Sequence, residues 1–508
     1  MADFDAKSIV DRSRAAFNAG KCKSLATRLE HLKNLYRMID EHEKDFCDAM
    51  KRDLNKPYTE CMGYEITLAK NEIIGYLENL SQWVKPERVK KPLFMLGQDA
   101  YIRREPLGVV LIIGAWNYPF QLTIHPLIGA IAAGNTVIIK PSELAEETAK
   151  ILADLLPKYL DSDCVQVVNG AVKETTALLE QKFDHILYTG NSVVGKIVMA
   201  AAAKHLTPVT LELGGKSPVF VDKNCDISTA ARRITWGKFV NSGQTCIAPD
   251  YILCEEEVKD QLVQAIKDTL KEFYGEDPQK SNDYGRIINE RHFKRLEDLL
   301  QGVNVAAGGK TVIDDKYIEP TIVTDVKGDE AVMQHEIFGP ILPIMIVKDA
   351  DDAIRYINSR AKCLALYVFS TDKNIVDKIQ HDTTSGAYSV NDTLMYGAID
   401  TLPFGGVGTS GMGAYHGKHT FETFSHRRAC VVAKLGMEAA NQIRYPPYSE
   451  KKYSWAQWLM AKKPKREGIL GFWPFTLLAM IFAAFFAKKV MRRGRGDSGD
   501  RPSIRSSL

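Results

Sequence analysis

The chain has 508 residues, too many for one simple hydrophobic core, and an ordinary globular composition, so two or three folded domains are expected. A formal net charge of +3 argues against nucleic acid as a partner. The nine cysteines are odd in number and form no Cys-x-x-Cys pair, which favours reduced thiols in the cytosol over a disulfide framework or a zinc site.

The N-terminal half is predicted to form a parallel, doubly wound α/β sheet. Residues 1–80 are expected to be helical, because apolar residues recur among charged ones at helical spacing. From residue 106 onward, short apolar runs alternate with helical patterns, which is typical of buried parallel strands and their crossover helices. The expected strands are 109–113, 136–139, 165–168 and 185–188. One expected helix ends near residue 133, and three others span 143–160, 172–181 and 194–205. Such sheets bind nucleotides beyond the carboxyl ends of their strands.

A second α/β region is expected between residues 213 and 391. Its predicted helices are 258–274, 291–301 and 350–358, and its predicted strands are 251–254, 342–347 and 364–369. A glycine-rich loop at 404–417 and a strand-like run at 429–435 follow.

The C-terminal part differs in kind from the rest of the chain. Residues 468–487 carry no charge and are flanked by basic clusters at 462–466 and 488–495. These 20 residues would form a helix of about 30 Å, the thickness of the hydrocarbon core of a bilayer. We therefore predict a C-terminal transmembrane helix that inserts as a tail anchor; a buried C-terminal helix is the alternative. The N-terminus has no cleavable signal peptide, so the large domain is expected on the cytosolic side.

Two segments contain residues suited to chemistry through a thioester. Residues 239–248, FVNSGQTCIA, place Cys246 in a polar, glycine-containing turn, and residues 211–218, LELGGKSP, place Glu212 beside a Gly-Gly turn. A thiol nucleophile and a general base are the minimum set for such chemistry. The alternatives are a small buried hydrophobic residue for Cys246 and a capping or ion-paired acid for Glu212.

Two glycine patterns compete for a phosphate-binding role. Residues 406–411, GVGTSG, match GxGxxG, but a proline precedes them and no strand-to-helix pattern surrounds them, so we interpret them as a shaped loop. Gly190 and Gly195 follow the predicted strand at 185–188 and open a helix. The N-terminus of a helix offers free N–H groups and a favourable dipole to a pyrophosphate, which favours this second pattern.

These segments resemble the signatures of the aldehyde dehydrogenase superfamily, from about the N-terminus to residue 445. The match covers the FxNxGQxCxA pattern around Cys246, the segment around Glu212, and the GxTxxG pattern, in which Ser192 replaces threonine and keeps the hydroxyl. The resemblance implies that Cys246 attacks an aldehyde, that hydride leaves to NAD, and that Glu212 activates the water that cleaves the thioester. It also implies that the Asn117 amide and the Cys246 backbone N–H stabilise the alkoxide.

The resemblance also assigns a cofactor site. Glu143 should repel a 2′-phosphate, so NAD is expected over NADP. The residues implied to bind the cofactor are Lys140 and Glu143 at the adenosine ribose, Gly190, Ser192 and Gly195 at the pyrophosphate, and Glu336 and Phe338 at the nicotinamide ribose and ring. No metal is expected, and His416, His419 and His426 are interpreted as structural.

The short N-terminal region, the GAWNYPF sequence and the apolar tail resemble the class 3 branch, and within it the membrane-bound enzymes that act on fatty aldehydes. This implies oxidation of medium- and long-chain aliphatic aldehydes to fatty acids by a homodimer. The implied location is the endoplasmic reticulum membrane with the catalytic domain facing the cytosol; the peroxisomal or another intracellular membrane stays open. Two alternatives also stay open: a membrane-bound dehydrogenase for aromatic or short-chain aldehydes, and a non-catalytic membrane-anchored scaffold of the same fold.

The expected fold is α/β, with a Rossmann-like doubly wound NAD-binding domain, an α/β catalytic domain, small oligomerisation strands and a C-terminal transmembrane helix. The linker before that helix contains aromatic residues at helical spacing, expected to form a helix that either gates the substrate funnel or merely packs on the body. The expected boundaries are 1–83 with 106–212 for NAD binding, 213–393 for catalysis, 84–105 with 394–445 for oligomerisation, 446–467 for the linker, 468–487 for the anchor and 488–508 for a basic tail.

Overall fold

The computed structural model describes residues 4–95, 97–436 and 438–461. The chain divides into one unit made of residues up to 89 with 100–431, and a second made of residues 90–99 with those from 432 on. Within the described residues, no helix has the length and apolar character needed to cross a bilayer. The predicted anchor at 468–487 and the basic tail at 488–508 lie outside the described residues, so both stay predictions.

The N-terminal region is helical, as predicted. Side-chain caps begin its first two helices: Asp5 accepts a hydrogen bond from the Ser8 N–H, and Ser24 from the Thr27 N–H, both at 3.0 Å. The helices are α1 (Ala6–Asn18), α2 (Leu25–Glu41), α3 (Glu43–Leu54), α4 (Tyr58–Cys61) and α5 (Thr67–Trp83), with a π-helical turn, η1 (Met62–Ile66), between α4 and α5.

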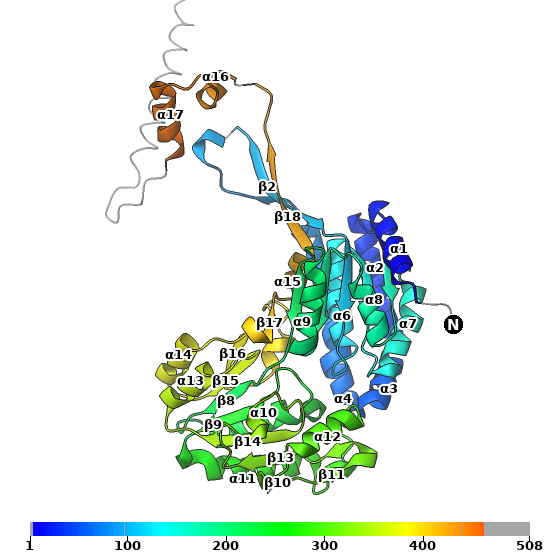
Figure 1. The fold of residues 1–508 in the computed structure, drawn as a ribbon, viewed down its shortest axis with the longest axis vertical. Coiled ribbons are helices and arrows are strands. Elements are labelled where there is room, and N and C mark those ends of the chain that lie inside the picture. The colour runs from blue at the N-terminus through cyan, green and yellow to red at the C-terminus, as the bar shows by residue number, and fades with distance from the viewer. Residues whose placement is uncertain (1–3, 96, 437, 462–508) are drawn as a thin grey trace, which may run out of the picture. The chain divides into compact units, whose positions relative to one another are not determined.

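A six-stranded sheet of order β17-β7-β6-β3-β4-β5 forms the first α/β layer (Figure 1). Its strands are β3 (Val109–Ile113), β4 (Thr136–Lys140), β5 (Val165–Val167), β6 (His185–Thr189), β7 (Val209–Glu212) and β17 (Gly411–Met412). All pairings are parallel except that of β17 with β7, which confirms the predicted parallel sheet. The connecting helices are α6 (Gln121–Ala133), α7 (Glu146–Tyr159), α8 (Val172–Leu179) and α9 (Ser192–Ala203).

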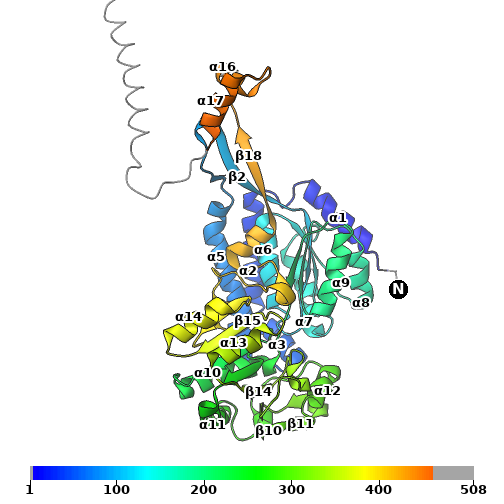
Figure 2. The same ribbon diagram turned by 60° about the vertical axis from the view of Figure 1, so that its left-hand side comes forward.

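Alternate residues of each central strand face opposite helical layers, as the pleat of a strand requires. Val109 and Leu111 pack with α1, α8 and α9, whereas Val110 and Ile112 pack with α2, α5, α6 and α7. Figure 2 shows this layered arrangement around the sheet. Since both faces are buried, the strand residues are apolar without alternation, which is the pattern that made them predictable.

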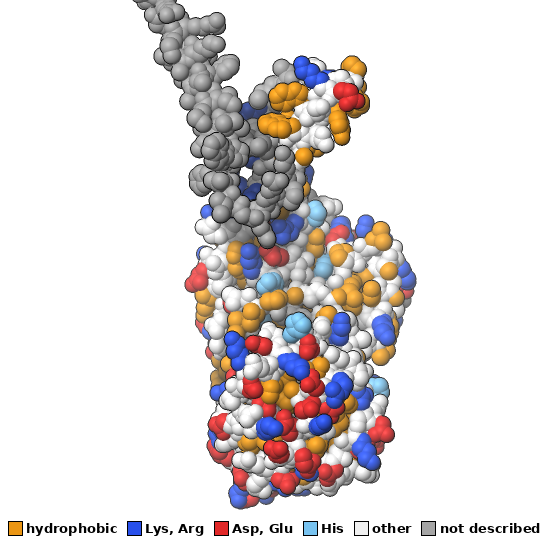
Figure 3. All heavy atoms as spheres, turned by 90° about the vertical axis from the view of Figure 1, so that its left-hand side faces the viewer, with side chains coloured by type: hydrophobic (Ala, Val, Ile, Leu, Met, Phe, Trp, Pro, Cys, Tyr) orange, Lys and Arg blue, Asp and Glu red, His pale blue; other side chains and the backbone are white. Residues whose placement is uncertain are grey.

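A seven-stranded sheet of order β10-β13-β14-β9-β8-β15-β16 forms the second α/β layer. Its strands are β8 (Pro218–Val221), β9 (Tyr251–Cys254), β10 (Asn304–Ala307), β13 (Thr321–Thr324), β14 (Ile341–Ile346), β15 (Ala365–Phe369) and β16 (Ala387–Val390). Its helices are α10 (Ile227–Phe239), α11 (Glu256–Tyr274), α12 (Glu290–Asp298), α13 (Ala350–Asn358) and α14 (Lys373–Asp382). On the face in Figure 3, acidic and basic side chains intermix over this part of the molecule, so their fields partly cancel.

Smaller elements complete the described chain. β1 (Glu87–Arg88), β2 (Asp99–Pro106) and β18 (Ser425–Val432) form a three-stranded sheet, and β11 (Thr311–Val312) pairs with β12 (Tyr317–Ile318). The strand predicted at 429–435 is thus shifted towards the N-terminus. The remaining helices are α15 (Gly417–Thr423), α16 (Glu438–Asn441) and α17 (Glu450–Met460). The helix predicted in the linker is therefore present as α17, and none of its residues is buried. The division of the chain by role stays a prediction.

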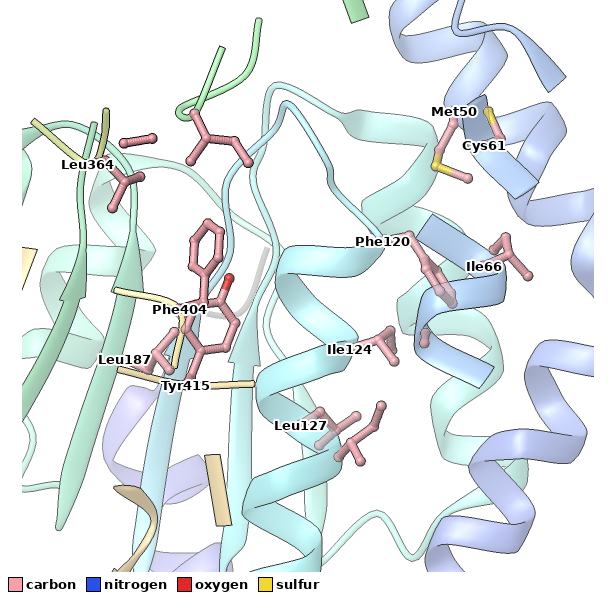
Figure 4. Packing of buried hydrophobic residues seen from close by; sticks show 14 of the residues in the cluster. Met50, Cys61, Ile66, Phe120, Ile124, Leu127, Leu187, Leu364, Phe404 and Tyr415 are labelled. Carbon is pink, nitrogen blue, oxygen red and sulfur yellow. The ribbon is translucent and has the colours of Figure 1, made fainter. Parts of the chain in front are cut away.

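The largest hydrophobic cluster joins elements distant in sequence. Figure 4 shows Phe120, Ile124 and Leu127 on one side of α6, directed towards the helices that carry Cys61 and Ile66. All five side chains are buried. The start of α6 is therefore fixed against the N-terminal helices.

Candidate active site

One cavity of about 1110 Å³ collects the residues predicted for catalysis and cofactor binding. It lies beyond the carboxyl ends of the parallel strands β3, β4, β6 and β7, where doubly wound sheets place their ligands. Of the predicted residues, the structure places Asn117, Lys140, Glu143, Gly190, Ser192, Glu212, Cys246, Glu336 and Phe338 on its wall. Gly195 does not line the cavity.

The loop before Cys246 has an irregular backbone that its own side chains hold. Asn241 and Ser242 both have φ of 52°, and Gly243 has φ of 74°. A Cβ atom on Gly243 would lie 2.3 Å from the Gly339 carbonyl oxygen, so only glycine fits there. The Gln244 side chain accepts from the Ile288 N–H at 3.0 Å and donates to the Asn241 carbonyl at 3.1 Å. These bonds fix the loop that ends at the thiol.

Cys246 is half-buried and its thiol is a weak acid in this setting. Burial, then the carboxyl groups of Glu212 and Glu336, raise the pKa of Cys246 well above its usual range, against the lowering effect of the Cys246 and Ile247 backbone N–H groups. At neutral pH the thiol therefore keeps its proton until a base removes it.

Glu212 is the last residue of β7 and is buried. Burial raises the pKa of its carboxyl group well above the usual range. Within the described part of the chain, Glu212 Oε1 has no hydrogen-bond partner. A buried carboxyl that lacks a partner and lines a cavity beside a thiol is suited to proton transfer with a bound molecule.

Asn117 connects the two loops that meet at the thiol. Its side-chain Nδ2 donates to the Gln244 carbonyl at 3.0 Å, and its own carbonyl accepts from Asn241 Nδ2 at 2.8 Å. An amide carries two N–H donors, so this bond leaves one N–H for a molecule in the cavity. Asn117 is buried, which strengthens such a donor.

The N-terminus of α9 lies on the cavity wall. Asn191 caps the helix by accepting from the Val194 N–H at 3.0 Å, and Ser192 is its first residue. A Cβ atom on Gly190 would lie 2.2 Å from Tyr188 Oη. On Gly195 it would lie 2.9 Å from a Leu213 methyl group, so Gly195 allows close packing of α9 on the chain after β7.

The remaining cofactor candidates also line the cavity. Lys140 Nζ donates to Glu143 Oε2 at 2.7 Å. Glu336 is half-buried, and burial, with Asp250 nearby, raises its pKa to about 8. Phe338 has φ of 48° and its ring meets Trp116 edge-on with centroids 5.3 Å apart.

The rejected glycine motif at 406–411 has a structural place. Gly411 in β17 pairs antiparallel with Glu212, and a Cβ atom on Gly411 would lie 2.3 Å from the Leu211 carbonyl oxygen. The motif therefore packs against β7, as its interpretation as a shaped loop requires. His416 is buried, its pKa falls to about 3 through burial, and its ring stacks on Phe404 with centroids 4.7 Å apart.

Sequence reasoning missed the residues that hold the reactive groups in place. Asn241 and Gln244 lie within the motif at residues 239–248, and their side-chain amides could have been predicted to stabilise the loop by hydrogen bonds. Lys56 and Glu65 gave no signal, because they resemble the other charged residues of the N-terminal helices. The structure buries both and pairs them.

Comparison with known proteins gives one consistent family. The family model described as "Aldehyde dehydrogenase family" matches residues 2–430. The chain is 56% identical over 474 residues to "Aldehyde dehydrogenase family 3 member A2" of Pongo abelii, covering 93% of this chain and 98% of the relative. It is 54% identical over 440 residues to "Aldehyde dehydrogenase, dimeric NADP-preferring" of Mus musculus, covering 87% and 97%.

A solved structure agrees. The structure described as "Substrate bound state of Staphylococcus Aureus AldH" superimposes with a TM-score of 0.88 and 44% identity, covering 90% of this chain and all of the other. The chain therefore belongs to the aldehyde dehydrogenase family and is an NAD(P)-dependent aldehyde dehydrogenase of its class 3 branch.

Proposed function

We propose that this enzyme oxidises medium- and long-chain fatty aldehydes to fatty acids, with NAD as the preferred cofactor and a thioester on Cys246 as the intermediate. The observation that carries the proposal is the presence of the Cys246 thiol, the unpartnered Glu212 carboxyl and the Asn117 amide on one cavity. Nucleophile, base and oxyanion donor are the three parts that acyl chemistry on a thiol needs.

The cofactor residues fit a dinucleotide. The free N–H groups at the start of α9 suit a pyrophosphate, and Gly190 keeps side-chain atoms away from it. Lys140 and Glu143 would hold the adenosine ribose, and Glu336 and Phe338 the nicotinamide end. When bound, the oxidised nicotinamide ring supplies a hydride acceptor. Glu143 favours NAD by charge, although a mouse relative is named NADP-preferring.

In the first stage, Cys246 becomes a nucleophile and its charge passes to the substrate oxygen. Ionised Glu212 takes the thiol proton as the sulfur–carbon bond forms. The resulting alkoxide accepts hydrogen bonds from the Asn117 side chain and the Cys246 backbone N–H. Loss of hydride from the carbon then leaves the thioester.

In the second stage, Glu212 takes a proton from water, which attacks the thioester carbon. The carbon–sulfur bond breaks and the thiolate is the leaving group. Protonated Glu212 returns its proton to the sulfur, so the fatty acid and the free thiol result. Because burial raises the pKa of Glu212, the carboxyl must lose a proton before either stage, so turnover should rise with pH.

The C-terminal sequence supports the proposed substrate class and location. A long-chain aldehyde gains about 0.8 kcal/mol for each CH₂ that leaves water, so a C16 aldehyde resides in lipid. The uncharged segment at 468–487 would hold the enzyme at that lipid surface. We propose the endoplasmic reticulum membrane, with the catalytic domain on the cytosolic side, and a homodimer.

The test is NADH production by detergent-solubilised enzyme with hexadecanal, benzaldehyde and a short aldehyde. Cys246→Ala should abolish turnover, whereas Cys225→Ala, which removes a half-buried thiol outside the cavity, should leave it unchanged. Turnover of the other aldehydes but not of hexadecanal would overturn the fatty substrate class. A lack of turnover with every aldehyde would favour a non-catalytic scaffold.

A further inference from the structure

A buried ion pair lies directly behind the loop that carries Asn117. Lys56, between α3 and α4, pairs with Glu65 of the π-helical turn η1, and both side chains are 0% exposed. Removing two charges from water costs several kcal/mol for each ion, so hydrophobic residues of equal size would often stabilise a core as well or better. A pair of this kind is a candidate for a role beyond stability.

The pair holds both ends of the segment from Asn117 to Gln121. Lys56 Nζ donates to the Asn117 carbonyl at 2.9 Å and lies 4.1 Å from the centroid of the Tyr118 ring. Glu65 Oε2 accepts from the backbone N–H groups of Phe120 at 3.0 Å and Gln121 at 3.1 Å, at the N-terminus of α6. One ion pair therefore fixes the loop and caps the helix that follows it.

The neighbouring contacts transmit this constraint to the thiol loop. The Asn117 carbonyl that Lys56 binds also accepts from Asn241 Nδ2 at 2.8 Å. The Asn117 side chain donates to the Gln244 carbonyl, two residues before Cys246. Phe120 packs on Phe46 with ring centroids 4.7 Å apart, so the loop has little freedom on its other side.

The π-helical turn accounts for the inward position of Glu65. An α-helix running unbroken from Tyr58 to Trp83 would advance about 100° per residue, and the wider turn at Met62–Ile66 shifts that register. Such turns recur at functional sites in proteins. Here the turn places an acid in the core beside Lys56, within reach of the first N–H groups of α6.

We propose that Lys56 and Glu65 are positioning residues, which touch neither substrate nor cofactor and hold the Asn117 amide where the alkoxide forms. This inference rests on the proposed role of Asn117 as an oxyanion donor. It predicts that removal of the pair lowers kcat and leaves substrate binding almost unchanged, because the amide interacts more strongly with the transition state than with the aldehyde.

The informative variant is the double substitution Lys56→Met with Glu65→Leu, in the full-length, detergent-solubilised enzyme. It removes both charges together and keeps much of the buried volume, which preserves folding better than leaving one charge unpaired. We expect kcat with hexadecanal to fall about 100-fold, with KM for aldehyde and NAD within about 2-fold of the wild type. Glu65→Gln keeps an acceptor for the Phe120 N–H, so its kcat should lie between that of the wild type and that of the double variant.

Two further variants test whether the fall in kcat comes from the loss of the Asn117 donor. Arg104→Met removes another enclosed cation, which does not line the cavity. Arg104 donates to Glu422 and to Glu87, each at 3.0 Å. This variant should lower the melting temperature without lowering kcat. Asn117→Ala should lower kcat about as much as the double substitution, and combining them should add little, because both remove the same donor.

Each outcome separates the inference from the proposed function. Wild-type kcat in the double variant, with kcat lowered in Asn117→Ala, would overturn the positioning role and leave the oxyanion role intact. Wild-type kcat in Asn117→Ala would overturn the oxyanion role, and the positioning role with it. Equal losses in kcat and NAD affinity would indicate general disorder of the fold and would also overturn the inference.

Discussion

Replacing Glu60 with glutamine should stabilise the protein at alkaline pH but not at acid pH. Glu60 lies in α4, is half-buried, and accepts a hydrogen bond from the Asn241 N–H at 3.0 Å. Burial raises its pKa from 4.5 to about 7, although Lys56 opposes the change. An acid with a raised folded-state pKa gives stability that is fully present below pH 4.5 and is lost as the pH rises through 7.

The size of the effect follows from the pKa values. The interval between 4.5 and about 7, at about 1.4 kcal/mol for each pH unit, corresponds to at most about 3.5 kcal/mol at pH 8. Glutamine keeps an acceptor for the Asn241 N–H and cannot ionise, so it should recover most of that free energy. For a chain of this length, we expect a rise in melting temperature of about 3 °C.

The assay is the melting temperature of the wild type and Glu60→Gln between pH 5 and pH 9. Glu257→Gln is the matched control, because Glu257 is exposed on α11 and the chemical change is the same. The difference in melting temperature between Glu60→Gln and the wild type should increase between pH 5 and pH 8. A difference of the same size at both pH values would refute the argument that burial keeps the Glu60 carboxyl protonated.

Three other outcomes are expected. Gly243→Ala would force alanine into a left-handed φ of 74° and bring its Cβ atom to 2.3 Å from the Gly339 oxygen. It should abolish NADH production and lower the melting temperature. An active variant would contradict the argument that the loop before Cys246 must be rigid. Alkylation of Cys246 by iodoacetamide should accelerate up to at least pH 9 because its pKa is raised, and a plateau below pH 8 would count against that environment. Glu143→Gln should raise the ratio of kcat/KM for NADP to that for NAD about 10-fold, and an unchanged ratio would remove Glu143 from cofactor selection.

The sequence predicted four strands of the six-stranded sheet, β3, β4, β5 and β6. The strands β3, β4 and β6 are apolar at their centres because both faces are buried, and they were predicted within one residue of their bounds. The edge strands β10 and β16 are partly exposed and were missed. The four-residue strands β7, β8 and β13 are largely or fully buried and were missed as well. Their pairing comes from neighbours distant in sequence, which no local pattern reports.

The candidate site shows the same division. Residues within long motifs, such as Cys246 and Asn117, could be placed on one cavity wall from the sequence. Lys56 and Glu65 could not, because a charged residue in a helical segment ordinarily faces solvent. Whether such a residue is solvated or paired in the core depends on where its partner lies, and here that depends on a π-helical turn.

The reactive groups come from two different sheets, and this explains the placement of the buried polar residues. Glu212 ends a strand of the six-stranded sheet, whereas Cys246 precedes β9 of the seven-stranded sheet. A rotation of one sheet against the other would separate base from nucleophile even with each sheet intact, and a displacement of about 1 Å can cost about 100-fold in rate. The segment from Lys56 to Glu65 contacts both sides, since Glu60 bonds the thiol loop and Lys56 the Asn117 loop. Substitutions in this segment should therefore lower the rate before they unfold either sheet, in contrast to substitutions on the outer helices.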